Sequence, residues 1–194
     1  MRHLWPMAAL ASLLCACYST PSPRYYVLDA VSRPTENASG PRVVVDAVTI
    51  PAVVDRPQFV LSGQGNEVFI DDEHRWAAPL ESNLAQALAS DLEAHVHDAD
   101  VGADRARPLP RYRVDVEILA FVSRLGEEVR LEAVWHVRRD DGATSSGRSR
   151  FREPAPGRDF SSLAAAHSRA VASLAREIAL RARDLGRGSA GQHS

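Results

Sequence analysis

The sequence contains no lysine, so all 23 of its basic residues are arginine. This absence excludes a Schiff-base lysine, the attachment of pyridoxal phosphate and the phosphate-binding lysine of a P-loop. Cysteine is also scarce, with only Cys15 and Cys17, both near the N-terminus. The net charge is −2, and without a basic field the chain lacks the electrostatic signature of a nucleic-acid-binding protein.

The charges are unevenly distributed along the chain. Residues 1–122 hold 10 arginines and 16 acidic residues, whereas residues 123–194 hold 13 arginines and 9 acidic residues. The second part is therefore modestly basic, which would suit anionic lipid headgroups or an acidic partner. The alternative is an ordinary solvated surface with charges of both signs.

The N-terminus has the pattern of a secretory signal peptide, which we place at residues 1–16. Arg2 supplies a positive charge, and the apolar run at residues 4–14 is too short to cross a bilayer as a permanent helix. The run ends in Leu14-Cys15-Ala16-Cys17, which resembles a lipobox, the signal of bacterial lipoproteins. That resemblance implies cleavage before Cys17 and acylation of its thiol. The alternative is a conventionally cleaved signal that leaves a free thiol.

Acylation would determine where the mature protein lies. One acyl chain binds a bilayer only marginally, whereas two or more anchor a protein stably, and mature bacterial lipoproteins carry three. The residue after Cys17 is Tyr18 and not Asp. Under the sorting rule of enteric bacteria, this favours the outer membrane, with the domain facing the periplasm.

Composition and segment boundaries predict one globular domain behind a short tether. The mature chain would have no disulfide, because a lipidated Cys17 cannot pair, so a hydrophobic core must stabilise it. A content of 45% hydrophobic residues is sufficient for that. We assign residues 17–24 to a tether, residues 25–185 to the domain and residues 186–194 to a flexible tail.

Hydrophobic patterning indicates several β-strands. The β-branched run at residues 42–50 predicts an interior strand, and residues 59–61 and 67–70 predict a hairpin around Gly63-Gln64-Gly65-Asn66. Residues 71–75 are expected to form a charged loop. Strict alternation predicts two long antiparallel strands at residues 112–122 and 129–137, followed by a weaker strand at residues 144–152. Trp135 falls on a core position.

Two helices are expected from apolar residues at helical spacing. Pro79 is well suited to begin the first helix, and Asp159 can cap the second. The apolar stripe of the first helix consists of Leu80, Leu84, Leu88, Leu92 and Val96; that of the second consists of Phe160, Leu163, His167, Val171, Leu174, Ile178 and Leu185. Together with the strands, this order predicts an α+β fold: a mainly antiparallel sheet with both helices packed on one face.

Several motifs in this order resemble the PqiC/YmbA family of auxiliary lipoproteins of ABC-type transporters. They are Tyr25-Tyr26-Val27-Leu28 after the lipobox, Asp55-Arg56-Pro57-Gln58-Phe59-Val60, and Trp76-Ala77-Ala78-Pro79-Leu80 at the head of a helix. The resemblance implies a lipoprotein tethered to the outer membrane. It also implies an inner-membrane MCE-domain protein as partner, in the transport of phospholipid or other apolar molecules.

Arg56, Gln58 and Trp76 are the candidate partner-binding residues, because aromatic and arginine side chains often dominate protein interfaces. The alternative is structural: residues 55–57 would shape a turn, and Trp76 would fasten the helix start to the sheet. A homo-oligomer is compatible with docking to a multimeric partner. The alternative function is a structural or assembly lipoprotein of another envelope complex, without lipid cargo.

The chemical motifs of common enzymes are absent from the sequence. There is no Gly-x-Ser-x-Gly elbow and no complete dinucleotide fingerprint. His95 and His97 lie two residues apart, so they would not share one face of a helix, and a solvated helix end is favoured over a metal site there. Residues 71–74 lack the glycine and spacing of a calcium loop. We therefore expect no enzyme activity, no cofactor and no metal.

Overall fold

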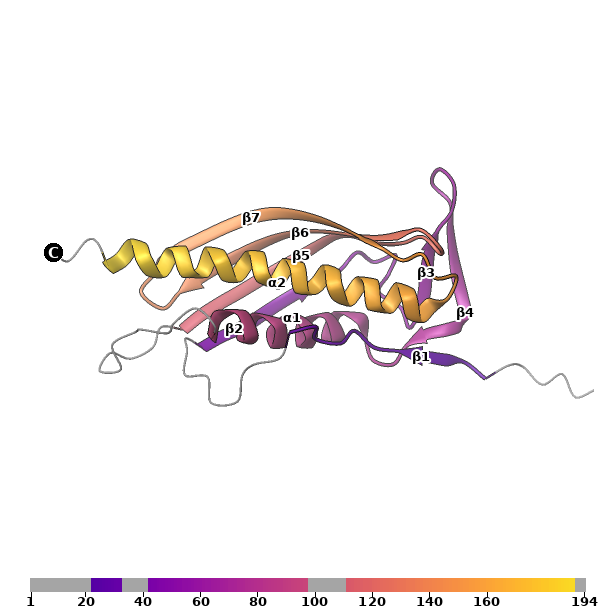
Figure 1. Ribbon diagram of the computed structural model, residues 1–194, viewed down its shortest axis with the longest axis horizontal. Helices are drawn as coiled ribbons and strands as arrows, with labels where there is room; N and C mark the ends of the chain where they lie inside the picture. Colours follow the sequence, from indigo (N-terminus) through magenta and orange to yellow (C-terminus); the bar gives the residue numbers. More distant parts are fainter. Residues whose placement is uncertain (1–21, 33–41, 98–110, 191–194) are drawn as a thin grey trace, which may run out of the picture.

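The computed structural model describes residues 22–32, 42–97 and 111–190 (Figure 1). The segments expected to form the signal peptide (residues 1–16) and most of the tether, including Cys17, lie outside these residues. The elements in chain order are β1 (Arg24–Tyr26), β2 (Arg42–Thr49), β3 (Gln58–Ser62), β4 (Val68–Trp76), α1 (Leu80–His97), β5 (Arg111–Ser123), β6 (Glu128–Arg139), β7 (Thr144–Pro154) and α2 (Phe160–Ala190). Among the described residues, neither α1 nor α2 contains an apolar stretch of the length that a membrane-spanning helix needs.

The larger sheet has four strands in the order β2-β5-β6-β7. β5, β6 and β7 pair antiparallel, as the alternating pattern predicted, whereas β2 pairs with β5 in parallel. Alternate residues of β5 and β6, including Val114, Val129 and Trp135, are almost completely buried. The expectation that residues 42–50 form an interior strand was wrong. β2 is an edge strand, and its apolar side chains are needed because α1 packs against it.

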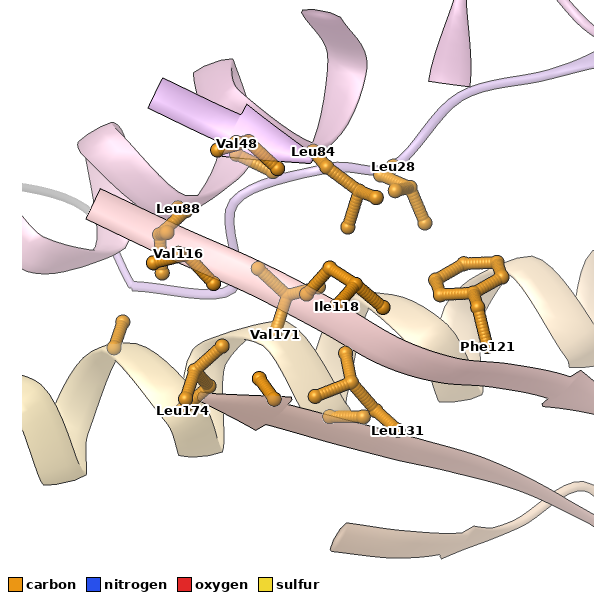
Figure 2. Close-up of a cluster of buried hydrophobic side chains, with 14 of the residues drawn as sticks. Leu28, Val48, Leu84, Leu88, Val116, Ile118, Phe121, Leu131, Val171 and Leu174 are labelled. Atoms are coloured by element: carbon orange, nitrogen blue, oxygen red, sulfur yellow. The ribbon is translucent and has the colours of Figure 1, made fainter. Parts of the chain in front are cut away.

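Both helices cover one face of the four-stranded sheet, as expected (Figure 1). α1 packs on β2, α2 packs on β6 and β7, and the helices contact each other. The predicted leucine stripe of α1 is buried throughout. Asp159 caps α2, with its Oδ1 accepting a hydrogen bond from the backbone N–H of Ser162 at 2.7 Å. Figure 2 shows side chains from both helices, β2, β5, β6 and the segment at Leu28 meeting in the core.

α2 continues to Ala190, past the boundary that we expected at Leu185, so the tail expected at residues 186–194 is helical in its first part. The sheet holds this helix end. Arg139 donates from Nη1 to the carbonyl oxygen of Leu185 at 2.8 Å. A Cβ at position 186 would lie 3.2 Å from the hydroxyl oxygen of Tyr112, so Gly186 allows a close approach to β5. Gly186 therefore allows α2 to pack closely against β5, and it does not end the helix.

A second, three-stranded sheet has the order β1-β4-β3. β3 and β4 form the predicted hairpin, and β1 pairs with β4 in parallel. Residues 71–75 belong to β4, so the charged loop expected there was wrong. At this point Asp71 Oδ1 accepts hydrogen bonds from the backbone N–H groups of Glu73 and His74, at 3.0 and 2.8 Å. The pairing register with β3 shifts at the same place.

Candidate docking surface

The segment after β1 is fastened to both helices. The side chain of Asn83 in α1 forms two hydrogen bonds with the backbone of Leu28, at 2.6 and 3.2 Å. The backbone N–H of Asp29 donates to Ser168 Oγ in α2 at 3.1 Å. The backbone N–H of Ser32 donates to Asp91 Oδ1 at 2.6 Å. These bonds fix the place where the chain enters the domain.

The carboxylate of Asp91 is completely buried at this attachment. Burial raises the pKa of Asp91, and the hydrogen bonds from Ser32 oppose that shift. His95 lies one turn further along α1, with Nε2 3.2 Å from Ser32 Oγ. These side chains serve the attachment of residues 28–32. No group of three or more His, Cys, Asp or Glu suited to a metal ion occurs in the part of the chain that the structure describes.

Trp76 lies in an aromatic cluster that joins the small sheet to the body of the domain. Its ring stacks on Phe59 of β3, with centroids 4.1 Å apart, and meets Phe121 of β5 edge-on at 6.1 Å. Phe59 contacts Phe160 at the start of α2 edge-on at 5.2 Å. These contacts join β3, β4, β5 and α2. The small sheet is therefore a packed part of the domain and not a loose extension.

Trp76 does not fit the expected partner-binding role, because only 4% of its surface is exposed. Its backbone N–H donates to the carbonyl oxygen of Pro57 at 2.7 Å, four residues before α1 begins at Leu80. Its position matches the structural alternative, in which the tryptophan fastens the helix start to the sheet. The tryptophan in this motif is thus a core residue.

Arg56 and Gln58 lie beside Trp76 and are half-buried, so both reach the surface. Gln58 pairs with Arg75 in the sheet, and its Nε2 donates to Asp72 Oδ1 at 3.4 Å. The Nε of Arg56 is buried and has no hydrogen-bond partner among the described residues. The structure thus brings all three predicted residues together and leaves two of them accessible to a partner.

One exposed feature was not apparent from the sequence, the tip of the β3–β4 hairpin. Val68, Phe69 and Ile70 are 49%, 52% and 46% exposed, although they are consecutive apolar residues of a strand. The hairpin rises away from the helices at the end of the molecule where β1 begins (Figure 1). A run of three apolar residues flanked on both sides by polar residues was the available signal, because alternation cannot bury all three on one face.

The basic character of the second half of the chain is largely compensated in the structure. Glu132 on β6 pairs with Arg148 and Arg150 on β7, which are 56% and 69% exposed. Hydrogen bonds from Arg150 and Arg148 lower the pKa of Glu132. Arg138 on β6 likewise pairs with Asp115 on β5 at 3.3 Å. This pairing favours the alternative of a solvated surface with charges of both signs over an anion-binding patch.

His167, the polar member of the α2 stripe, is completely buried. Its Nε2 lies 2.8 Å from Ser123 Oγ, and its ring stacks on Phe121 with centroids 3.7 Å apart. Burial lowers the pKa of His167 to about 3, so the ring is neutral at physiological pH. This serine–histidine pair is enclosed in the core and out of reach of a substrate.

Comparisons with known proteins agree with this architecture. The model of a family described as "ABC-type transport auxiliary lipoprotein component" matches residues 26–179. A crystal structure of an uncharacterized protein has a TM-score of 0.64 and 16% identity, with coverage of 83% of this chain and 99% of the other. A DUF330 protein from Xanthomonas campestris also has a TM-score of 0.64, with 14% identity and coverage of 87% and 100%. A search of curated protein sequences found no match.

Proposed function

The chain belongs to the family of ABC-type transport auxiliary lipoprotein components, and we propose that it serves an MCE-type system of the cell envelope. Its coarse role follows from the family: it is an accessory lipoprotein of a transport system, which is not a class of enzyme. In the finer proposal, acyl chains on Cys17 hold the domain at the periplasmic face of the outer membrane. There it docks an inner-membrane MCE-domain protein that moves phospholipid or other apolar molecules.

The observation that carries this proposal is the family match over residues 26–179, which spans most of the domain expected at residues 25–185. The geometry is compatible with a tethered docking module. The chain enters the domain at a fixed point, because Leu28, Asp29 and Ser32 are all bonded to the helices. Tethering to a membrane raises the local concentration of the domain for a partner that reaches the same leaflet.

Arg56 and Gln58 are the proposed partner-contacting residues. Both are half-buried: Arg56 lies just before β3 and Gln58 is the first residue of that strand, next to the aromatic cluster that anchors it. A rigid base under partly exposed polar side chains limits the entropy lost on binding. If the partner is multimeric, several copies of this domain could bind it together, and a homo-oligomer would match its symmetry.

A site-specific photocrosslinking experiment in cells tests this function. A photoreactive amino acid replaces Gln58 in the full chain, and a control carries it at Leu180, which is exposed on α2. We expect the Gln58 position to capture an MCE-domain protein and the Leu180 position not to do so. Lipids that co-purify with the complex are then identified by mass spectrometry. Capture of a different envelope protein without lipid would favour the structural or assembly role instead.

A further inference from the structure

The β3–β4 hairpin carries the strongest unexplained feature of the molecule. Val68, Phe69 and Ile70 form the only run of three consecutive exposed large apolar residues in the part of the chain that the structure describes. Neighbouring residues of a strand point to opposite faces, so Phe69 lies on one face of the hairpin and Val68 and Ile70 on the other. Water therefore contacts apolar side chains on both faces of the hairpin tip, which is costly without a covering partner.

The parallel pairing of β1 with β4 relates this tip to the proposed lipid anchor. Arg24 pairs with His74. Cys17 precedes Arg24 by seven residues, a reach of at most about 23 Å at ~3.3 Å per residue. Val68 precedes His74 by six residues, at most about 20 Å along β4. Arg24 and His74 are neighbours in the sheet. Starting from this pair, the acyl chains on Cys17 and the hairpin tip at Val68 can therefore both reach the surface of the same membrane.

The view of the whole molecule agrees with this relation. The hairpin and the start of β1 lie at one end of the domain, whereas α2 ends at the opposite end (Figure 1). A membrane that holds the N-terminus would therefore lie on the side of the hairpin. The segment at residues 28–32, which is bonded to both helices, prevents the domain from turning freely about β1.

The charges around the tip also suit a lipid interface. Between the strands, the turn at residues 63–67 carries a single charged side chain, Glu67. The acidic run Asp71-Asp72-Glu73 follows Ile70 directly, and Asp72 and Glu73 are exposed. Charged groups remain in water or among headgroups, so this run limits how deeply the hairpin can enter. Shallow insertion is also required because the outer edges of the strands carry backbone groups that need hydrogen-bond partners.

We propose that Val68, Phe69 and Ile70 insert into the interfacial region of the leaflet that holds the acyl chains of Cys17. The inference rests on the proposed anchoring at Cys17 and adds a second, weaker membrane contact. Interfacial apolar segments enter a membrane by about 5–10 Å, a depth that the three side chains can reach. With two points of contact, the domain has a fixed orientation, and Arg56 and Gln58 face a constant direction for a partner.

A fluorescent label tests the insertion. The mature lipidated chain has no other free thiol, so Val68→Cys can be labelled selectively with an environment-sensitive fluorophore. Leu180→Cys is the matched control, because both side chains are 49% exposed in the native protein. Each labelled lipoprotein is reconstituted into vesicles of phosphatidylethanolamine and phosphatidylglycerol that contain lipids with a nitroxide near the headgroup. Emission wavelength and quenching are measured after flotation.

We expect the label at position 68 to shift to shorter wavelengths in vesicles and to be quenched severalfold more strongly than the label at position 180. Equal quenching at both positions in floated protein would overturn the insertion and leave the anchor intact. Protein that does not float would contradict the anchor and, with it, this inference. A shift that appears without vesicles and grows with protein concentration would identify a second copy as the occupant and overturn the inference.

A pair of substitutions tests the same contact without a label. In the unlipidated Cys17→Ser chain, the double variant Phe69→Ser, Ile70→Ser should bind these vesicles about tenfold more weakly, because two half-exposed apolar side chains no longer enter the interface. Leu180→Ser is the control and should bind unchanged. Since all three residues are exposed, the melting temperatures of the variants should match; unchanged vesicle binding by the double variant would overturn the insertion.

Discussion

The ring of Trp76 stacks on the ring of Phe59 with centroids 4.1 Å apart, which fastens the end of β4 to β3. The same tryptophan donates its backbone N–H to the carbonyl oxygen of Pro57. Through these contacts, the segment with Arg56 and Gln58 is held against the end of β4. The shape of the proposed docking surface therefore depends on the buried Trp76, whereas the half-buried Arg56 and Gln58 would contact the partner.

Trp76→Ala should destabilise the domain by about 3–5 kcal/mol, because it removes a large, buried aromatic side chain and leaves a cavity. Chemical denaturation followed by circular dichroism measures this change. Tyr25→Ala is a suitable control, since Tyr25 is 62% exposed and should change the stability by less than about 1 kcal/mol. Similar losses in both variants would contradict the role assigned to the aromatic cluster.

Arg56→Ala and Gln58→Ala, unlike Trp76→Ala, should leave the stability of the domain almost unchanged but weaken binding of the partner. Each side chain is half-buried, so we expect the free energy of unfolding to change by about 1 kcal/mol or less. Capture of the MCE-domain partner in cells should fall when both are replaced. Quantitative crosslinking at a third, unchanged position measures this loss. A stable double variant that captures the partner at the normal level would remove these residues from the interface.

Gly147→Ala should be destabilising, although alanine suits a strand better than glycine does. A Cβ at position 147 would lie 2.4 Å from Cζ2 of Trp135, whose indole also donates to Ser149 Oγ at 2.8 Å. Displacing a buried ring in this way costs about 1–3 kcal/mol. Ser146→Ala, at an exposed neighbouring position, is the control for thermal denaturation. A melting temperature equal to that of the control would show that the ring can move freely.

The stability of the domain should decrease as the pH falls below about 6.5. Burial lowers the pKa of His167 to about 3, whereas the unfolded chain has the ordinary value near 6.5. Between these values, only the unfolded state binds the proton, and the free energy of unfolding falls by up to about 1.4 kcal/mol per pH unit. In His167→Gln this slope should be reduced, as measured by urea denaturation from pH 7 to pH 5. Equal slopes in both proteins would contradict the burial of a neutral ring.

Much of the fold could be predicted because the spacing of apolar residues along a helix or strand reflects which of its faces is buried. The leucine stripe of α1 and the alternation in β5 and β6 each correspond to buried faces. The parallel partners of β1 and β2 were not predictable, since a strand's own pattern does not specify its neighbour. For the same reason, the valine-rich sequence of β2 predicts an interior strand, whereas β2 lies at the edge of the sheet and is covered by α1.

The errors at single residues have related causes. Residues 71–75 are rich in charge, which usually indicates a loop, but both faces of this part of the small sheet tolerate polar side chains. Gly186 usually indicates a helix end, but here its missing side chain admits Tyr112. For Trp76 the sequence leaves both partner binding and a structural role open, because tryptophan is common at interfaces and in cores. Only the three-dimensional structure distinguishes partner binding from core packing. Here Trp76 is a core residue that stacks on Phe59.

The most direct test of the account is mass spectrometry of the N-terminal peptide of the mature protein, isolated from the membrane fraction of cells. The account predicts that this peptide begins at Cys17 and carries diacylglyceryl and N-acyl groups, and that Cys17→Ser releases the protein from the outer-membrane fraction. A mature chain that begins at another residue, or an unmodified Cys17 in protein that still fractionates normally, would contradict the lipid-anchored role.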